Sequence, residues 1–456
     1  MGYSLNAVQA EAVLQALKQN YSVYAPKRFP KQGRYSDTDV IKYAEVEHYE
    51  DIVWQVKSDY PAKEVLTPIQ QAIFYFTEDE YRASKGPKKP ILILARPCDI
   101  NAQHVQAKIY AGNGGYTDLY YERMREKVKF ALMECNGGDD TCFCVSMGTN
   151  KTDDYSLALK FSDEGVQVQV TDETFAPYFE GMPQAGYTPA FVEENELKVT
   201  VPDLDDKAVR LALKSHPMWK EFDGRCISCG ACTVACSTCT CFTTRDVIYG
   251  DNPEVGERRR VTASCQIAGF DQMAGQREFR STAGERMRYK VLHKFHDYKA
   301  RFGEGHMCVG CGRCIAVCNT DAIRPGNDAA MEELGCRMAE YAKAVVDGRP
   351  QFHISLVIDV SPYCDCHGEN DLPIVPDVGM FASFDPVALD QACADACGKQ
   401  SPIPGSHLDE QMHREGFCDK HDHFINSMPD TDWRVCLDHC EKIGIGTRSY
   451  ELVEVK

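Results

Sequence analysis

The chain has 456 residues, 23 of them cysteines, and a formal net charge of −18. This acidic balance argues against a general nucleic-acid-binding role, and the length allows hydrophobic cores that need no disulfide framework. Because the start lacks a signal-peptide pattern and no run of about 18 apolar residues could span a membrane, we expect a soluble, cytoplasmic protein with reduced thiols that can bind metal.

Residues 1–220 are predicted to form an α/β domain. Apolar side chains recur at helical spacing in residues 5–20 and predict an amphipathic helix. Its apolar face would carry Leu5, Val8, Val13, Leu14 and Leu17. The short apolar run ILILA at 91–95 predicts a buried strand. This strand ends in RPCD and therefore places Cys98 and Asp99 at a strand end.

Four cysteines of this domain are candidate ligands: Cys98, Cys135, Cys142 and Cys144. Soft thiolates suit iron–sulfur clusters, and the polar, glycine-rich segment ECNGGDDTCFC suits a ligand site better than a core. Their separation in sequence is no obstacle, because closing a longer loop costs only slowly more entropy. We predict that the four hold a [4Fe–4S] cluster. The alternative is four buried free thiols.

Residues 221–325 contain the spacing C-x2-C-x2-C-x3-C twice. This is the spacing of two-cluster bacterial ferredoxins, in which three close cysteines hold one cube and the fourth ligates the other. The first cluster is therefore predicted on Cys226, Cys229, Cys232 and Cys318, and the second on Cys308, Cys311, Cys314 and Cys236. Structural zinc sites fit the spacing poorly, because they generally pair C-x2-C with a distant second pair or with histidines.

Two further cysteines, Cys239 and Cys241, lie outside the repeat. They could be thiols beside a cluster, alternative ligands or plain buried cysteines. The 71-residue insert between the runs is basic, since residues 256–301 carry 11 Lys and Arg against 5 Asp and Glu. This charge indicates a solvated face, a docking surface or cationic compensation of anionic clusters. Its segment MRYKVLHKFHDYKARF predicts a helix with Met287, Val291, Leu292 and Phe295 on one side.

Residues 326–456 predict a third, α/β domain. A helix is expected at 338–348 and a buried strand at 353–360. Cys364, Cys366 and His367 could bind a metal with Asp377, although a turn with incidental thiols explains them as well. Two pairs of cysteines at i, i+4 spacing fall in predicted helical segments and would share one helix face: Cys393 with Cys397, and Cys436 with Cys440.

Several longer segments occur in one order along the chain: RYSDTD, IFYFTED, ILARPCDINA, CFCVSMGTNKTD, RCISCGACTVAC, NPEVGERRR, MRYKVLHKFHDYKARFG and HMCVGCGRC. Together they resemble the A-type subunits of anaerobic sulfite reductases over about residues 1–320, and more distantly the beta subunits of cytosolic sulfhydrogenases. The tail, from SPYCDCHGENDLPIVPDVGMF to KIGIGTRSYELVEV, resembles the C-terminal part of the domain of unknown function 362 family. The N-terminal part of that family is not evident.

The first resemblance implies an electron-transfer subunit. Its partners would be a flavin subunit that oxidises NADH and a siroheme subunit that reduces sulfite to sulfide. No phosphate loop or nucleophile elbow occurs in the sequence, and we assign no catalytic residue to this chain. Two other interpretations stay open: a sulfhydrogenase-type beta subunit, and a zinc-stabilised scaffold protein without redox activity.

The sequence therefore predicts a multidomain α+β protein. Its parts are an α/β domain at 1–220, a dicluster ferredoxin-like domain with a basic insert at 221–325, and an α/β domain at 326–456. The expected cofactors are at least two [4Fe–4S] clusters, with the third on the N-terminal cysteines.

Overall fold

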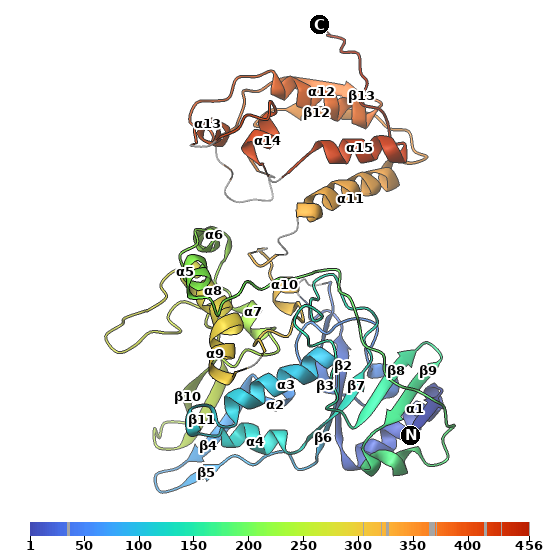
Figure 1. Cartoon of the computed structure of the whole chain (residues 1–456), viewed down its shortest axis with the longest axis vertical. Coiled ribbons are helices and arrows are strands. Elements are labelled where there is room, and N and C mark those ends of the chain that lie inside the picture. The colour runs from blue at the N-terminus through green and yellow to red at the C-terminus, as the bar shows by residue number, and fades with distance from the viewer. Residues whose placement is uncertain are drawn as a thin grey trace. The chain divides into compact units, whose positions relative to one another are not determined.

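A computed structural model describes residues 1–33, 37–303, 305–320, 322–324, 328–363, 370, 372–414, 417–429 and 431–455. The chain forms two compact units, Met1–Pro325 and Gly326–Lys456. Several sheets and many helices confirm the predicted multidomain α+β class (Figure 1). The further division of the first unit near residue 220 stays a prediction.

A seven-stranded mixed sheet forms the centre of the first unit. Its four middle strands β8, β7, β6 and β2 are parallel, and the outer pairs are antiparallel. In spatial order the strands are β1 Gly2–Leu5, β9 Gly165–Val170, β8 Leu157–Ser162, β7 Val128–Met133, β6 Ile91–Ala95, β2 Ser22–Phe29 and β3 Val40–Glu45. The predicted strand at 91–95 is confirmed, and all five of its residues are buried.

Two hydrophobic cores cover the two faces of this sheet, because successive strand residues point to opposite faces. On one face, Leu92 and Leu94 pack with helix α1 (Ala7–Asn20). On the other face, Ile91 and Ile93 pack with α2 (Lys63–Leu66), α3 (Pro97–Tyr110) and α4 (Leu119–Arg125). The result is a three-layer arrangement that holds the strand ends in place.

Helix α1 begins at a capping box in which Asn6 accepts from Gln9 and Gln9 accepts from Asn6. The predicted helix is therefore confirmed from Ala7 onward, with Val13, Leu14 and Leu17 buried, but its predicted start is wrong because Leu5 belongs to strand β1. The prediction of Val8 on the apolar face is wrong, since this residue is 79% exposed. Three short helical turns complete this part of the unit: η1 Tyr49–Asp51, η2 Asn113–Gly115 and η3 Glu173–Phe179.

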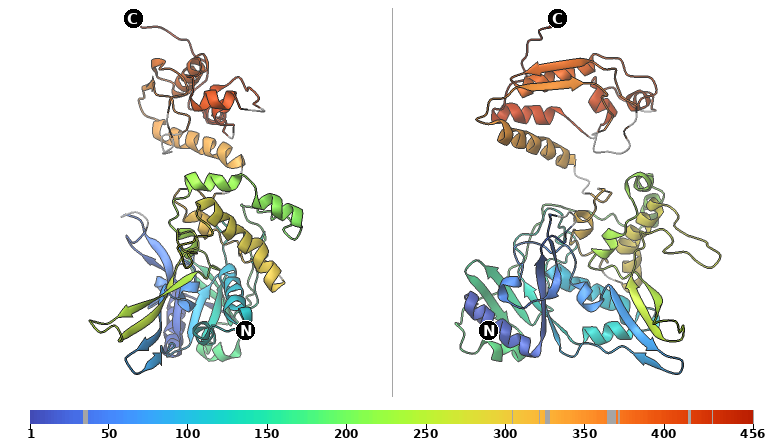
Figure 2. Two further views of the ribbon diagram at one scale, coloured as in Figure 1. Left: turned by 90° about the vertical axis from the view of Figure 1, so that its left-hand side faces the viewer. Right: turned by 180° about the vertical axis from the view of Figure 1, so that it is seen from behind.

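A second, antiparallel sheet joins the basic insert to the N-terminal part of the chain. Its order is β10 Phe242–Ile248, β11 Gly256–Thr262, β4 Gln70–Phe76 and β5 Tyr81–Ala83. Figures 1 and 2 show the β10–β11 hairpin beside the blue β4–β5 hairpin. The helices of this part are α5 Lys207–Lys214, α6 Met218–Arg225, α7 Ala231–Val234, α8 Ala283–Leu292, the π-helix η4 His293–Asp297, α9 Tyr298–Phe302 and α10 Arg313–Ala316.

The second unit packs helices around a two-stranded antiparallel sheet of β12 (His353–Val357) and β13 (Gly379–Ser383). The predicted strand at 353–360 is confirmed but ends at Val357, and the prediction that it is buried is wrong, since Ile354 and Leu356 are exposed and only Val357 is buried. The predicted helix at 338–348 corresponds to the end of the longer helix α11, which stops at Val346. The helices are α11 Asp328–Val346, α12 Pro386–Gly398, α13 His407–Met412, α14 His423–Ser427 and α15 Arg434–Ile443. Within the described part of the chain, no helix is both long and apolar enough to cross a membrane.

Candidate functional site

The carboxyl edge of the parallel sheet carries the first group of candidate cysteines. Strands β6 and β7 are parallel neighbours, with Ala95 opposite Leu132. Cys98 lies in the first turn of α3 directly after β6, and Cys135 follows the end of β7 by two residues. Because both strands end at the same edge of the sheet, the two thiols come from adjacent loops.

Cationic and polar side chains contact three of these thiols. The Nη1 atom of Arg96 lies 3.1 Å from the Sγ atom of Cys135, and the Nζ atom of Lys57 lies 3.5 Å from that of Cys142. The thiol of Cys144 donates to Oδ1 of Asn195 over 3.5 Å. Positive groups at this distance stabilise thiolates, which are the form that binds metal.

Neighbouring thiols contribute to the raised pKa of Cys144 and of Cys98. Burial raises the pKa of Cys144 to about 11, and the neighbouring Cys142 and Cys135 contribute to the rise. Burial likewise raises the pKa of Cys98 well above its usual range, and Cys144 is among the charges that add to this shift. These interactions connect Cys98, Cys135 and Cys142 with Cys144, but among the described residues no group of three or more His, Cys, Asp or Glu side chains is placed to hold a single metal ion. That the four cysteines bind a cluster stays a prediction.

The two cysteine runs fold in the same way. Each run passes a glycine in the left-handed region, Gly230 with φ 79° and Gly312 with φ 69°, and then forms one helical turn, α7 or α10. The third cysteine of each run, Cys232 or Cys314, lies in that turn. The two turns contact each other. Cys229 of the first run is exposed, whereas Cys311 of the second is buried.

Cys236 acts on the pKa of cysteines in the second run as well as on that of Cys232 in its own run. Burial raises the pKa of Cys308 to about 12, and Cys236 contributes to the rise. Burial also raises the pKa of Cys314, with Cys308, Cys311 and Cys236 adding to it. Cys236 must lie near the second run if the fourth cysteine of the first run ligates the second cluster. The sulfur of Cys318 lies 3.9 Å from the Thr320 hydroxyl, and its assignment to the first cluster stays a prediction.

The second run is packed tightly against the loop that contains Cys142 and Cys144. The backbone N–H of Phe143 donates to the carbonyl of Gly310 over 2.8 Å. A Cβ atom on Gly310 would lie 2.5 Å from the Phe143 carbonyl oxygen, and one on Gly312 would lie 2.1 Å from that of Thr141. Only glycine permits this approach, and it brings the N-terminal cysteines beside the second run.

Two buried lysines of the basic insert contact thiols. The Nζ atom of Lys290 lies 3.2 Å from Cys232 Sγ, and that of Lys294 lies 3.2 Å from Cys236 Sγ. Each lysine is 6% exposed. Burial opposes their charge, but the nearby thiolates outweigh it and raise the pKa of both lysines above the ordinary value. This finding favours cationic compensation over a solvated face for these two lysines.

The helix that carries them differs from the prediction in the face it buries. Met287 is buried as expected, but Val291, Leu292 and Phe295 are only half-buried. The other buried positions of this segment are Lys290, Lys294 and Tyr298. The pattern of apolar residues did not indicate this face, because the face carries lysines. Their ammonium groups contact sulfur atoms and hydroxyls of the cysteine loops that the face covers.

One cysteine near the first run was missed in the sequence. Cys265 follows β11, and the β10–β11 hairpin places it beside Cys241, to which its thiol is hydrogen-bonded. That hydrogen bond is the main reason that the pKa of Cys265 falls to about 5, while the pKa of Cys241 rises. Cys265 also acts on the pKa of Cys232. The only signal in the sequence was the hairpin pairing, since the cysteine spacing is irregular.

The extra cysteine Cys239 is buried, and its thiol is hydrogen-bonded to that of Cys236. Because of this bond, and with Lys294 nearby, the pKa of Cys236 falls well below the ordinary value and that of Cys239 rises. Lys63, which is 5% exposed, donates to the carbonyls of Thr233 and Cys239 at 3.2 and 3.1 Å. These contacts favour the interpretation that Cys239 is a thiol beside a cluster.

The cysteines of the second unit form pairs on its own helices. Cys393 and Cys397 lie on α12, and Cys436 and Cys440 on α15, so both predicted helical pairs are confirmed. Asp377 accepts from the backbone N–H of Asp359 over 3.0 Å. The candidate ligands Cys364, Cys366 and His367 lie outside the described residues.

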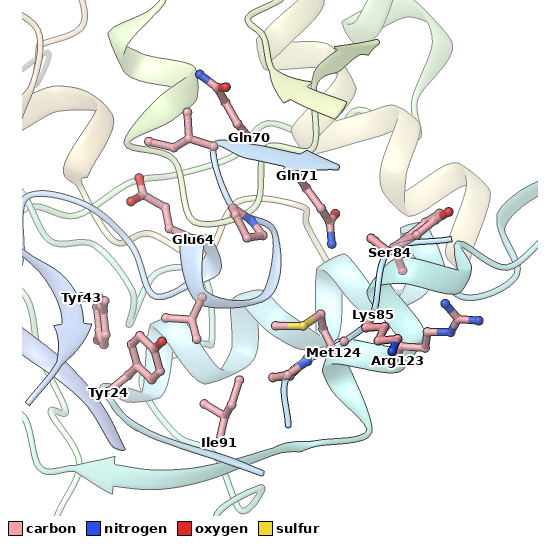
Figure 3. A pocket seen from close by; sticks show the side chains of 16 residues that line it. Tyr24, Tyr43, Glu64, Gln70, Gln71, Ser84, Lys85, Ile91, Arg123 and Met124 are labelled. Carbon is pink, nitrogen blue, oxygen red and sulfur yellow. The ribbon is translucent and has the colours of Figure 1, made fainter. Parts of the chain in front are cut away.

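A cavity of about 600 Å³ lies apart from the cysteines, between strands β2 and β6, helix α4 and the β4–β5 hairpin. Figure 3 shows Tyr24, Glu64, Lys85 and Arg123 around it. Burial raises the pKa of Glu64. No cysteine is among the described residues that line the cavity, so we do not include it in the candidate site.

The residues present fit iron–sulfur clusters. The donor sets are reduced cysteine thiols, in part buried, and buried cations lie within hydrogen-bond distance of several sulfur atoms. Anionic clusters need such compensation in an interior of low dielectric. Comparison with known proteins agrees: residues 225–322 match the family of 4Fe–4S dicluster domains.

One curated relative matches over a longer stretch. The chain is 27% identical over 327 residues to the sulfhydrogenase 2 subunit beta of Pyrococcus furiosus, which covers 66% of this chain and 90% of that protein. No solved structure matches the chain. These findings support the predicted iron–sulfur domain and do not bear on sulfite reduction specifically.

Proposed function

We propose that the chain is an iron–sulfur electron-transfer subunit that carries electrons between two partner subunits of an oxidoreductase complex. The observation that carries this proposal is the duplicated cysteine run, whose Cys236 lies near enough to the opposite run to contribute to the raised pKa of Cys308 and Cys314. Each bound [4Fe–4S] cluster would supply a one-electron carrier. The protein supplies the thiolate ligands, their spacing and the surrounding charge.

The contacts between the cysteine groups support a chain of three centres. The first and second runs meet through Cys236 and through the touching turns α7 and α10. The second run meets the N-terminal cysteines through the contact of Gly310 with Phe143. Cys229 is exposed, and the neighbouring Ile227 is 62% exposed. We therefore propose that a partner subunit docks at the first run.

For the complex itself we propose an NADH-dependent anaerobic sulfite reductase. This assignment rests on the long ordered resemblance over about residues 1–320. The partners would be a flavin subunit that oxidises NADH and a siroheme subunit that reduces sulfite to sulfide. No catalytic residue of the present chain is needed in this role.

A second candidate is the beta-type subunit of a cytosolic sulfhydrogenase. The specific observation in its favour is the 27% identity to the Pyrococcus furiosus beta subunit across nine tenths of that protein. In this case a hydrogenase subunit would take the place of the siroheme subunit. The cysteine arrangement of the present chain serves both complexes equally.

Anaerobic purification of the complex from its native host tests both levels of the proposal. Iron and sulfide analysis with EPR of the reduced chain should show at least two [4Fe–4S] clusters, whereas a zinc-loaded, EPR-silent chain contradicts the electron-transfer role. Co-purified siroheme with sulfite-dependent NADH oxidation supports the sulfite reductase. Co-purified nickel with hydrogen evolution supports the sulfhydrogenase and excludes the first assignment.

A further inference from the structure

Lys290 and Lys294 contact cysteines that are predicted to serve different clusters. Lys290 donates to Cys232, a predicted ligand of the first cluster, and also to the Thr233 hydroxyl at 3.2 Å. Lys294 donates to Cys236, a predicted ligand of the second cluster, and also to the Thr238 hydroxyl at 2.9 Å. Each ammonium is therefore held by a hydroxyl beside one specific sulfur atom.

The helix that carries the two lysines is built to aim them at these loops. They are four residues apart, the spacing that places side chains on one face of a helix. Lys290 is in α8, and Lys294 is in the π-helical segment His293–Asp297. Single π-helical turns inside α-helices occur frequently at functional sites. The segment thus presents two cations to two cysteines of the first run, which are predicted to serve different clusters.

In the part of the chain that the structure describes, carboxylates do not compensate these charges. Within the described part of the chain, neither ammonium forms an ion pair with Asp or Glu, although each lysine is only 6% exposed. A buried lysine without a carboxylate is costly unless another anion lies nearby. The anions that face the two lysines are the cysteine sulfurs and, when bound, the clusters that these sulfurs would hold.

We propose that Lys290 and Lys294 separately raise the reduction potentials of the two clusters, Lys290 through Cys232 on the first and Lys294 through Cys236 on the second. The inference rests on the proposed electron-transfer function. Reduction adds one electron to a cluster and makes no bond, so the negative charge of the centre grows. A fixed positive charge and a hydrogen bond to a ligand sulfur favour the more negative state, and they do so most strongly where water is excluded.

The test is an EPR-monitored redox titration of the full-length, anaerobically purified chain and its variants. Lys290→Met removes the charge with a similar volume, and we expect the larger fall in the potential of the first cluster, whose predicted ligand Cys232 the ammonium contacts. Lys294→Met should cause the larger fall in the potential of the second cluster, whose predicted ligand is Cys236. In each variant we expect the equilibrium constant for reduction of the cluster to fall at least tenfold. For a one-electron couple this is a fall of about 59 mV in the reduction potential.

Lys299→Met is the matched control on the same helical segment. Lys299 pairs with Asp205 at 2.5 Å, its side chain is 42% exposed, and we expect both potentials to stay at their native values. Unchanged potentials in Lys290→Met and Lys294→Met chains that retain their iron would overturn the inference. Equal shifts in all three variants would also overturn it, because they would reflect net charge alone.

A second set of variants decides the case in which a methionine variant loses its cluster. Lys290→Gln keeps a donor without the charge, and Lys290→Arg keeps the charge. Iron retained only in the arginine variant, with a near-native potential, supports the inference. Loss of iron in all of them would assign Lys290 to packing and overturn it. If the native chain binds no clusters, the proposed function itself is wrong. If the chain binds its clusters but their potentials do not change in the lysine variants, only the present inference is wrong.

Discussion

Arg313 and Asp99 form a bidentate ion pair in the interior of the first unit, with Nη1 and Nη2 of the guanidinium 2.8 and 2.7 Å from the two carboxylate oxygens. Each side chain is 1% exposed. The Ser237 hydroxyl also donates to Asp99 over 3.0 Å. One carboxylate just after the end of strand β6 therefore connects both cysteine runs to the parallel sheet.

We expect the Asp99→Ala substitution to destabilise the protein by about 3–5 kcal/mol, because it leaves the Arg313 guanidinium buried without its counter-charge. The shift of the denaturant midpoint of the full chain measures this loss. The control is Asp246→Ala, which breaks the similarly bidentate pair with Arg258 at 40–46% side-chain exposure and should cost about 1 kcal/mol or less. Equal costs would contradict a structural role for the buried pair.

The close approach of the second run to the loop at 141–144 gives a second prediction. Gly312→Ala would place a Cβ atom 2.1 Å from the Thr141 carbonyl oxygen and must push the two loops apart. Gly303→Ala is a matched control, because this glycine has a similar φ of 81° but nothing within 4 Å of the added atom. We expect the control to lose only about 1–2 kcal/mol of left-handed strain and Gly312→Ala to lose more and to bind less iron. Similar losses of stability in Gly312→Ala and Gly303→Ala would show that the close contact between the two loops does not stabilise the protein.

The fourth ligand of the first cluster is the subject of a third prediction. The exchange of fourth cysteines requires Cys318, whereas the structure places Cys265 near Cys232. We expect Cys318→Ala to remove the EPR signal of the first cluster or to convert it to a three-iron signal. Cys265→Ala should keep the native signal. The reverse result would assign Cys265 as the ligand and Cys318 as a free thiol.

Much of this arrangement could be predicted from the sequence because its signals are local. The spacing of the two runs, the strand at 91–95 and the helices around the C-terminal cysteine pairs each depend on a few consecutive residues. The apolar run at 91–95 also predicted the strand end on which Cys98 lies. Such features follow from periodicity and from the size of a cube, without knowledge of the distant contacts.

The parts that were missed depend on contacts between distant residues. The pairing of β11 with β4, which joins residues 256–261 to 70–76, leaves no local pattern, and the irregular cysteine spacing gives no sign that Cys265 lies beside Cys241. The burial of Lys290 and Lys294 contradicts the ordinary preference of lysine for water, since it depends on thiols and hydroxyls supplied by another segment. Helical periodicity alone therefore chose the wrong face.

The last prediction is that the four N-terminal cysteines hold a third [4Fe–4S] cluster. Cys98 and Cys135 leave the carboxyl ends of adjacent parallel strands, and Cys142 and Cys144 come from the loop that the second run holds in place. Two cations, Arg96 and Lys57, contact two of the sulfurs. Four thiols that merely filled a core would need no cations beside them, because a neutral thiol is a small hydrophobic group.

Cys135→Ala should therefore lower the iron content by about four atoms per chain while the EPR signals of the other two clusters remain. The control is Cys397→Ala, which removes a buried thiol of α12 in the second unit and should leave the iron content unchanged. Loss of all clusters in the Cys135 variant would indicate misfolding, and Cys142→Ala then provides a second measurement, because its sulfur is supplied by a loop and not by a strand end. Full iron content in both variants would show that these cysteines are free thiols and that the chain carries two clusters only.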